Sequence, residues 1–410
     1  MSKDKIFNRK VINDPIYGFI SINDKLIFQV LEHPYVQRLR RIQQMGMASL
    51  VYPGALHTRF SHSVGAMHLT DMAIENLRQK GFVISSEDAQ AAKLAILLHD
   101  VGHGPFSHAL ENVFIQNMTH EEVTALILKK LNNSFGGQLA TCISVFENSH
   151  NHKFLHQLIS GQLDMDRMDY LTRDSFYTGV SEGIINIDRI LKMLTVFNDA
   201  IAVEEKGVYS IENFIMARRL MYWQVYYHKT SLVAEHMLIQ ALNRSRFLIA
   251  EGNNISAPES LLYFLKNNIG KNQFINSDEA FNHFINLDDW DIHTALKQWQ
   301  YAGDFVLKSL CSAIINRKLF RLEIIDAPVT ASFMADKTKE TALKYNISLE
   351  DAAYFTGCGE IRNNAYNPYN DKITIVDKEG EKSDITDFSQ QLNLALYSKT
   401  VSKYFVYYPK

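Results

Sequence analysis

Apolar residues recur at helical spacing through most of the first 250 positions of the chain. In the segments 62–80, 87–99, 121–131 and 153–160 they stand mostly three or four residues apart. This spacing places apolar side chains on one face of an α-helix, where they pack against a core. We therefore predict a helix over each segment, and one or two long helices rich in aromatic residues over 213–251.

Two shorter patterns predict further elements. Apolar residues at helical spacing over 36–45 are followed by Gly46, which predicts a helix that ends there. The runs 200–203 and 208–211 contain strand-forming residues and are separated by a short stretch that ends in glycine. Such a pair of runs predicts a β-hairpin.

From about residue 254 onward, helical and extended patterns alternate. Helices are predicted over 260–266, 280–285, 289–299 and 304–315, and strands over 319–325, 372–376 and 402–408. No internal repeat or low-complexity linker separates this part from the first. We expect a mainly α protein, with a helical core over 1–253 and a smaller α+β region over 254–410 packed on it.

Composition narrows the class of protein. The 410 residues are 46% hydrophobic and 21% charged, as in ordinary globular proteins. A net charge of −3 gives no general attraction for nucleic acid, so an anionic ligand needs a local cluster of Arg and Lys. Three scattered cysteines match no metal or redox spacing and favour a reducing compartment. We expect a cytoplasmic protein without a signal peptide or a membrane partner.

The stretch 99–108 carries the strongest chemical signal. It begins with a His-Asp pair after an apolar run and contains three histidines in ten residues. An imidazole and a carboxylate side by side suit a borderline divalent metal. The alternative is a helix end with glycines as breakers, but that explains the glycines and not the histidines. The stretch therefore predicts a metal site.

Two other segments carry candidate partners for this site. His57 and His62 stand on either side of an arginine, in a turn that leads into a predicted helix. Farther along, Asp166, Tyr170 and either Arg173 or Asp174 fall on one face of a predicted helix. A charged helical face is usually only solvated, but beside a His-Asp pair the metal-site interpretation is favoured.

These motifs together resemble a known family. The strings Arg-Phe-Ser-His-Ser, His-Asp-Val-Gly-His-Gly-Pro-Phe-Ser-His and Asp-Met-Asp-Arg-Met-Asp-Tyr, in this order, resemble the HD-domain phosphohydrolases. The resemblance is closest to the deoxynucleoside triphosphate (dNTP) triphosphohydrolases and spans about 10–229. The C-terminal part matches only in its alternation of helical and extended patterns. It implies an HD-domain helical core, and hydrolysis of a dNTP to a deoxynucleoside and inorganic triphosphate.

The resemblance also implies a metal centre. Its four ligands would be His62, His99, Asp100 and Asp166. This set leaves positions for water and a phosphate oxygen and suits Fe, Mn, Zn or Ni. Mg could accompany the triphosphate. Three neighbouring groups are expected to support the site without binding the metal, namely His57, His68 and Asp164.

Catalytic and substrate-binding positions follow from the same resemblance. Near the α-phosphate it implies His103, His108, Glu111 and His120, with His108 and His120 as proton-transfer groups and Glu111 placed to orient His108. For the triphosphate it implies Arg59, Arg167 and Arg218. For the sugar it implies Gln44, Tyr170 and Asp174, where the tyrosine disfavours a 2′-hydroxyl, and Tyr226 would lie near the base.

The N-terminal strings resemble the regulatory nucleotide site of this family, which lies across a subunit interface. The residues concerned are Lys10, Val11, Asn13, Glu32, Gln37 and Arg40. Glu204 and Glu205 replace an expected arginine and would repel a triphosphate, so we expect weak or absent activation by GTP. The alternative is that Arg38 and Arg40 are simply exposed on an amphipathic helix. A homodimer or homotetramer is expected.

Two other functions stay open at this point. One is another HD-type phosphohydrolase that acts on a nucleoside monophosphate, a guanosine alarmone or a cyclic nucleotide. The released product, triphosphate or orthophosphate, separates it from the first hypothesis. The other is a nucleotide-binding sensor with a vestigial metal site, against which the intact set of candidate ligands argues.

Overall fold

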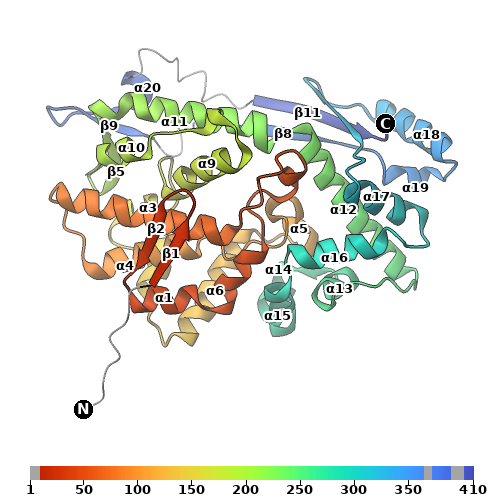
Figure 1. Ribbon diagram of the computed structural model, residues 1–410, viewed down its shortest axis with the longest axis horizontal. Coiled ribbons are helices and arrows are strands. Elements are labelled where there is room, and N and C mark those ends of the chain that lie inside the picture. The colour runs from red at the N-terminus through yellow and green to blue at the C-terminus, as the bar shows by residue number, and fades with distance from the viewer. Residues whose placement is uncertain (1–9, 364–371, 389–400) are drawn as a thin grey trace.

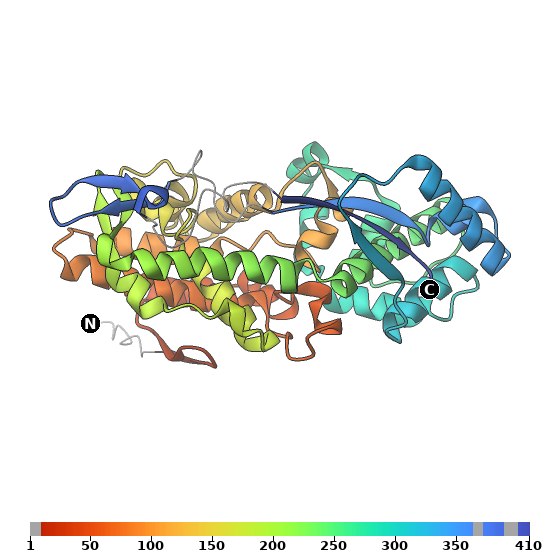
Figure 2. The same cartoon turned by 90° about the horizontal axis from the view of Figure 1, so that it is seen from above.

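The computed structural model describes residues 10–363, 372–388 and 401–410. The described part is mainly helical and elongated (Figures 1 and 2). The helices of 59–178 gather toward one end, and the helices and strands of 305–363 form the other. A mainly α architecture with a smaller strand-containing C-terminal region is confirmed.

The helices predicted from apolar spacing in the first part are confirmed. They are α3 (Arg59–Gln79), α4 (Ser86–Leu98), α6 (His120–Ser134) and α8 (Lys153–Gln157). Helix α9 (Met165–Thr178) packs on α3, as α4 does. Their apolar faces are buried in the core, because packing these faces together removes apolar surface from water.

Helices α3 and α9 approach each other closely at Gly65, which lies in the middle of α3. A Cβ at this position would collide with the carboxylate of Asp169 and the guanidinium of Arg173. Both groups belong to α9 and are fully buried. A residue without a side chain is therefore needed at position 65 to let the two helices meet.

We expect Gly65→Ala to lower the free energy of unfolding by about 1–3 kcal/mol, because the added methyl group forces a buried ion pair apart. Midpoints of urea denaturation measure the effect. Gly303→Ala is the matched control, since a Cβ there meets open space and the backbone is not left-handed. Equal midpoints for the two variants would contradict the close approach of α3 and α9.

The helix predicted over 36–45 ends early and is wrong for its last residues. Helix α2 (Pro34–Gln37) continues as one 3₁₀ turn, and the chain then becomes extended. Backbone pairing with a later segment replaces the helical hydrogen bonds. Gln44 donates its N–H to the carbonyl of His57 over 3.0 Å. This pairing draws Gln44 toward the start of α3.

The predicted β-hairpin lies earlier in the chain than expected. It pairs β4 (Leu194–Phe197) with β5 (Ala200–Glu204), and 208–211 is helical. The connecting Asn198 and Asp199 have φ of 48° and 61°, and a two-residue turn of this kind needs left-handed backbone at both positions. The prediction is wrong because this Asn-Asp pair forms the turn, and not the stretch that ends in glycine.

The aromatic-rich segment forms two long helices, as predicted. They are α11 (Val208–Met221) and α12 (Lys229–Ala250), and a π-helical turn at Tyr222–Tyr226 joins them. A π-helical turn shifts the phase of the helix and is common at functional sites. Here it gathers several tyrosines at one place.

Shorter elements complete the first part. Strands β1 (Lys10–Asp14) and β2 (Gly18–Ile22) form an antiparallel hairpin that the sequence analysis did not predict. The remaining elements are α1 (Lys25–Leu31), α5 (Glu111–Phe114), β3 (Ile115–Gln116), α7 (Ala140–Phe146) and α10 (Ile187–Met193).

In the second part, all predicted elements are present. They are α13 (Glu259–Lys266), α15 (Asp278–Asn286), α16 (Asp289–Trp299), α17 (Phe305–Ile315), β7 (Arg321–Ile325), β9 (Thr374–Val376) and β11 (Val401–Tyr408). Elements that were not predicted are β6 (Ile269–Gly270), α14 (Lys271–Asn276), α18 (Ala331–Tyr345), α19 (Leu349–Ala353), β8 (Gly357–Asn363), β10 (Lys382–Asp384) and α20 (Ile385–Phe388).

Two sheets join the parts of the chain before and after 254. Strand β9 pairs in parallel with β5, and the sheet has the order β10-β9-β5-β4. Strands β3 and β6 also pair in parallel. A third sheet, β7-β11-β8, is antiparallel and lies at the far end of the molecule (Figure 1). Backbone hydrogen bonds therefore hold the two parts of the chain together.

Candidate metal centre and adjoining cavity

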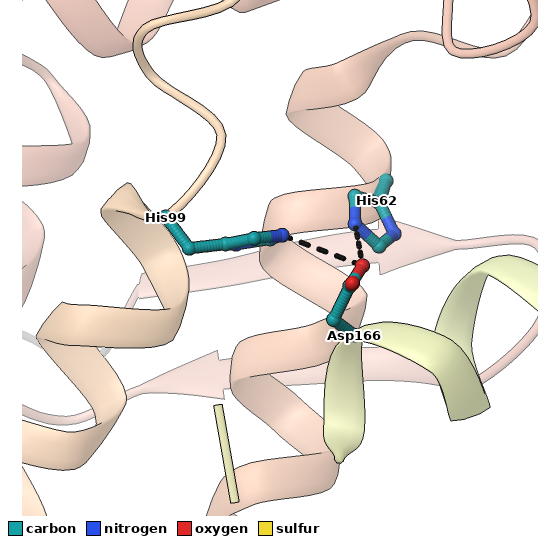
Figure 3. Close-up of side chains that lie close together, drawn as sticks. All are labelled: His62, His99 and Asp166. Atoms are coloured by element: carbon teal, nitrogen blue, oxygen red, sulfur yellow. Dashed lines mark ion pairs between the residues drawn. The ribbon is translucent and has the colours of Figure 1, made fainter. Parts of the chain in front are cut away.

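Three helices bring the side chains of His62, His99 and Asp166 together (Figure 3). Nε2 of His62 lies 3.0 Å from Oδ1 of Asp166, and Nε2 of His99 lies 3.4 Å from the same oxygen. His62 comes from α3, His99 follows the last residue of α4, and Asp166 stands in the first turn of α9. The packing of these three helices therefore creates the cluster.

The other nitrogen of each histidine is held in place. Nδ1 of His62 lies 2.7 Å from Oδ2 of Asp169, and Nδ1 of His99 donates to the carbonyl of Ile96 over 2.6 Å. A histidine that donates from Nδ1 keeps its Nε2 lone pair for a ligand. Both rings are thus oriented to present Nε2 to one point.

The carboxylates dominate the electrostatics of the cluster. Burial alone would lower the pKa of His62, but the neighbouring carboxylates of Asp166 and Asp169 raise it to about 10. Burial would raise the pKa of Asp166, yet the two histidines hold it well below its usual range. The carboxylates of Asp166 and Asp169 thus flank His62 on both sides, and an ionised carboxylate at this position favours a cation beside it.

The residues present fit a divalent metal. Neither Nε2 has a hydrogen-bond partner among the described residues, although both atoms are buried, and an unsatisfied buried nitrogen is costly. The ligand atoms of His62, His99 and Asp166 all lie within 4.8 Å of one another. Two imidazoles and a carboxylate suit Fe, Mn, Zn or Ni.

Asp100, the fourth expected ligand, lies beside the cluster. Its Oδ1 is 3.3 Å from Nε2 of His99 and 3.4 Å from Nε2 of His103. Its Oδ2 accepts from Arg59, whose guanidinium helps to hold the pKa of the buried carboxyl well below its usual range. Asp100 therefore stays ionised, with one oxygen on the side of the two histidines.

Asp169 is a residue that the sequence analysis did not select. It is fully buried and contacts both His62 and Arg173. The signal was present, since Asp169 falls on the same helix three residues after Asp166. Two aspartates so spaced can both point at one neighbouring helix.

We expect Asp169→Asn to weaken metal binding by about 10–100-fold, because a neutral amide holds His62 less firmly. Titration of the metal-free protein measures the dissociation constant. Asp14→Asn is the matched control, because Asp14 also pairs with Arg173, over 2.8 Å, but has no contact with His62. An equal loss of affinity in both variants would show that Arg173, and not His62, carries the effect.

Two further histidines stack next to the cluster. The rings of His103 and His120 lie 3.9 Å apart and 17° from parallel. Oε1 of Glu111 lies 2.8 Å from Nδ1 of His120 and accepts the backbone N–H of the same residue. Glu111 thus contacts His120, whereas the sequence analysis expected it to orient His108. The side chain of His108 lies outside the described part of the structure.

A cavity of about 370 Å³ collects most of the expected sugar-binding and base-binding residues. Gln44, Tyr170, Asp174 and Tyr226 all line it. Both oxygens of Asp174 are held: the hydroxyl of Tyr226 donates to one over 2.7 Å, and His57 contacts the other, also over 2.7 Å. His57 thus supports Asp174, in keeping with its expected position outside the metal site.

The three expected phosphate-binding arginines have different surroundings. Arg59 is buried, lines the cavity and donates to Ser107 and Asp100. Arg167 pairs with Asp164 over 2.6 Å, and Asp164 also caps helix α9. Arg218 donates to Gln162 over 3.3 Å. Of the three, only Arg59 is among the lining residues of the cavity.

The expected regulatory residues lie on the surface of the N-terminal part. Val11 and Arg40 are exposed, and Arg40 donates to Gln37 over 2.8 Å. The remaining members of the set, Lys10, Asn13 and Glu32, are also exposed. Glu204 is paired with Lys80 over 2.6 Å, which offsets the charge that would repel a triphosphate.

Two buried charged residues that hold the His-Asp loop were also missed. Arg38 is fully buried and donates to the carbonyls of His103 and Leu287, over 2.8 and 3.1 Å. Asp289 accepts the backbone N–H of Phe106 over 2.9 Å, and burial raises its pKa to about 6. The expectation that Arg38 is exposed is wrong, because its partners come from segments distant in sequence.

Comparison with known proteins identifies the family. The model of the HD domain matches residues 59–174, and that of the HD-associated region matches 185–262. The first range contains all of α3, α4 and α9 up to Asp174, and thus the whole histidine–aspartate cluster. The chain belongs to the HD-domain phosphohydrolases.

Its relatives include proteins with and without an assigned activity. YwfO of Bacillus subtilis, an uncharacterized protein, is 34% identical over 77% of this chain and 72% of its own length. A phosphohydrolase from Bacteroides thetaiotaomicron of known structure is 47% identical, with a TM-score of 0.95 over 98% of this chain and 100% of that one. Human deoxynucleoside triphosphate triphosphohydrolase SAMHD1 is 29% identical over 57% of this chain, which spans 44% of the human protein.

In the described residues, no helix combines the length and the apolar character that crossing a membrane requires. The expectation about the cellular compartment stays a prediction.

Proposed function

We propose that this protein is a metal-dependent dNTP triphosphohydrolase. One observation carries the proposal: helix α9 holds Asp166 against the two histidines, and then Tyr170 and Asp174 against the cavity. Residues four apart on a helix stand about 6 Å apart along its axis. A nucleotide with its α-phosphate at the cluster would thus have its sugar beside Tyr170 and Asp174.

His62, His99, Asp100 and Asp166 would hold the divalent metal, which is Fe, Mn, Zn or Ni. When bound, it supplies Lewis-acid stabilisation of the charge on the phosphoryl group. Arg59 would add positive charge near the phosphoryl group, because it donates to Asp100 and also lines the cavity. Arg167 and Arg218 would contact the rest of the triphosphate, with Mg as a further counterion.

In the proposed reaction, the oxygen of water forms a bond to the α-phosphorus, and the bond from that phosphorus to the 5′ oxygen breaks. The water loses a proton, and the leaving oxygen gains one. His120 is suited to a proton transfer, since Glu111 holds its Nδ1 and fixes its tautomer. His103 packs face to face on His120 and limits its movement. We retain His108 as the second proton-transfer candidate.

At the sugar end, Tyr170 would discriminate against a 2′-hydroxyl and Asp174 would accept from the 3′-hydroxyl. Asp174 retains lone pairs for this contact, because a carboxylate can accept about four hydrogen bonds. Gln44 offers a second contact, since its Oε1 is buried and has no hydrogen-bond partner among the described residues. Tyr226 donates to Asp174 and would lie near the base.

We expect Tyr170→Ala to narrow the preference for dATP over ATP by about tenfold, because removing the ring makes room for the 2′-hydroxyl. The ratio of kcat/KM for the two nucleotides measures the effect. Tyr301→Ala is the control, as Tyr301 is 81% exposed. If the parent protein turns over ATP as readily as dATP, Tyr170 does not read the sugar.

The experiment that tests the function is product analysis. The metal-loaded protein is incubated with each dNTP, with and without GTP, and the phosphorus-containing products are identified. Release of inorganic triphosphate and deoxynucleoside supports the proposal. Release of orthophosphate or pyrophosphate would instead favour another HD-type phosphohydrolase, and absence of any product from nucleotides that bind would favour a sensor.

We further propose that the protein assembles as a homodimer or homotetramer, with the N-terminal strands at an interface. A regulatory nucleotide could bind there through Lys10, Val11, Asn13, Glu32, Gln37 and Arg40. A ligand activates only if it binds the active assembly more tightly than the inactive one. With Glu204 and Glu205 in place of an arginine, we expect that difference to be small.

A further inference from the structure

The cavity has further lining residues that were not assigned from the sequence. Among them are Tyr227, Ser231 and Glu235. Ser231 lies in the first turn of α12, and Glu235 follows one turn later. Residues four apart lie on the same face of a helix, so both present their side chains to the same side.

The two side chains differ in burial. Ser231 is 2% exposed, and its hydroxyl has no hydrogen-bond partner in the described part of the chain. Glu235 is half-buried and lines the same cavity. Buried polar groups in proteins are nearly always satisfied. An unsatisfied hydroxyl beside a carboxyl on one wall of a cavity therefore indicates that a ligand completes this wall.

The position of this wall indicates which part of a nucleotide it meets. Asp174 occupies the sugar end, and the hydroxyl of Tyr226 reaches it over 2.7 Å. Helix α12 begins three residues after Tyr226, and its Ser231 and Glu235 line the same cavity as Tyr226 and Asp174. A base attached to the sugar would extend to this wall.

We propose, as an extension that rests on the proposed function of the site, that Glu235 and Ser231 contact the nucleobase and select it by its hydrogen-bonding edge. They favour a base with two adjacent N–H donors, such as guanine, over thymine. A carboxylate can accept from both donors at once, and the serine hydroxyl can meet a neighbouring acceptor. Thymine presents one N–H between two carbonyl oxygens, and these oxygens repel a carboxylate.

The electrostatic environment of Glu235 agrees with a role in accepting hydrogen bonds from a base. Desolvation raises the pKa of its carboxyl to about 7. The one cation among the lining residues, Arg59, already pairs with Asp100. The N–H donors of a base would replace the water that Glu235 loses on burial.

The test compares the kcat/KM of dGTP with that of dTTP for the Mn-loaded protein. Glu235→Gln keeps the size of the side chain but replaces one acceptor by a donor. We expect it to lower the dGTP/dTTP ratio about tenfold, which is the usual scale for losing one of two paired contacts. Ser231→Ala should lower the ratio less. Glu259→Gln is the matched control, because Glu259 is an exposed residue in the first turn of α13, and it should leave the ratio unchanged.

The outcomes separate this inference from the proposed function. If the parent protein hydrolyses dNTPs but Glu235→Gln leaves the ratio unchanged, the base-reading role is wrong and the function stands. If no dNTP is hydrolysed, the function is wrong, and calorimetric binding of dGTP and dTTP decides the base question. A preference for dGTP that Glu235→Gln removes would support the inference, and equal affinities in the parent protein would overturn it.

Discussion

Asp166→Ala is expected to leave the protein folded but without its metal. The substitution removes the carboxylate oxygen that lies 3.0 Å from His62 and 3.4 Å from His99, and with it the anionic member of the cluster. Two imidazoles and the one remaining carboxylate, Asp100, bind a divalent ion far more weakly than the complete set does. Metal content should fall from about one ion per chain to near zero, and hydrolysis should fall below detection.

Elemental analysis of the purified protein measures this effect. Asp188→Ala is the matched control, because Asp188 also stands in the first turn of a helix, α10, but is exposed. It should keep the metal content of the parent protein. Full metal occupancy in Asp166→Ala would contradict the proposal that the cluster is a metal site.

His120→Ala is expected to lower kcat by about 10²-fold or more while the metal and the affinity for nucleotide remain. His120 is held by Glu111 on one side and by the ring of His103 on the other. Its removal takes away a positioned proton-transfer group and leaves His62, His99 and Asp166 unchanged. Glu111→Gln should show a smaller loss of the same kind, since the ring is then held less firmly.

Single-turnover kinetics measures the rate of hydrolysis, and a nucleotide-binding assay measures the affinity, so the two effects of His120→Ala can be separated. His152→Ala is the control, since the side chain of His152 is about half exposed and pairs only with a surface aspartate in the described structure. A weaker affinity for nucleotide with an unchanged rate at saturation would reassign His120 to binding.

Much of the fold follows from local patterns. Apolar residues at helical spacing predict α3, α4 and α6, because a helix with one apolar face gains the most from burying that face. The His-Asp pair lies where the apolar run of α4 ends, which places its side chains at the edge of the core. These features depend only on residues close together in sequence.

The predictions that are wrong depend on contacts between distant segments. Residues 42–45 leave the helical path because Gln44 pairs with the backbone of His57. Arg38 is buried because carbonyl groups of Val101, His103 and Leu287 surround its guanidinium. Neither partner set can be read from the residues that precede or follow the one concerned.

The sequence by itself determined the helical core, the chemical types of the candidate ligands and their order along the chain. The tertiary structure decided which groups meet: Asp169 holds His62, Glu111 holds His120, and Ser231 and Glu235 line the same cavity as Asp174. Spacing along a helix fixes which face a side chain occupies, but not what that face contacts. The contact is set by the way helices pack, and at Gly65 that packing depends on the absence of a single Cβ.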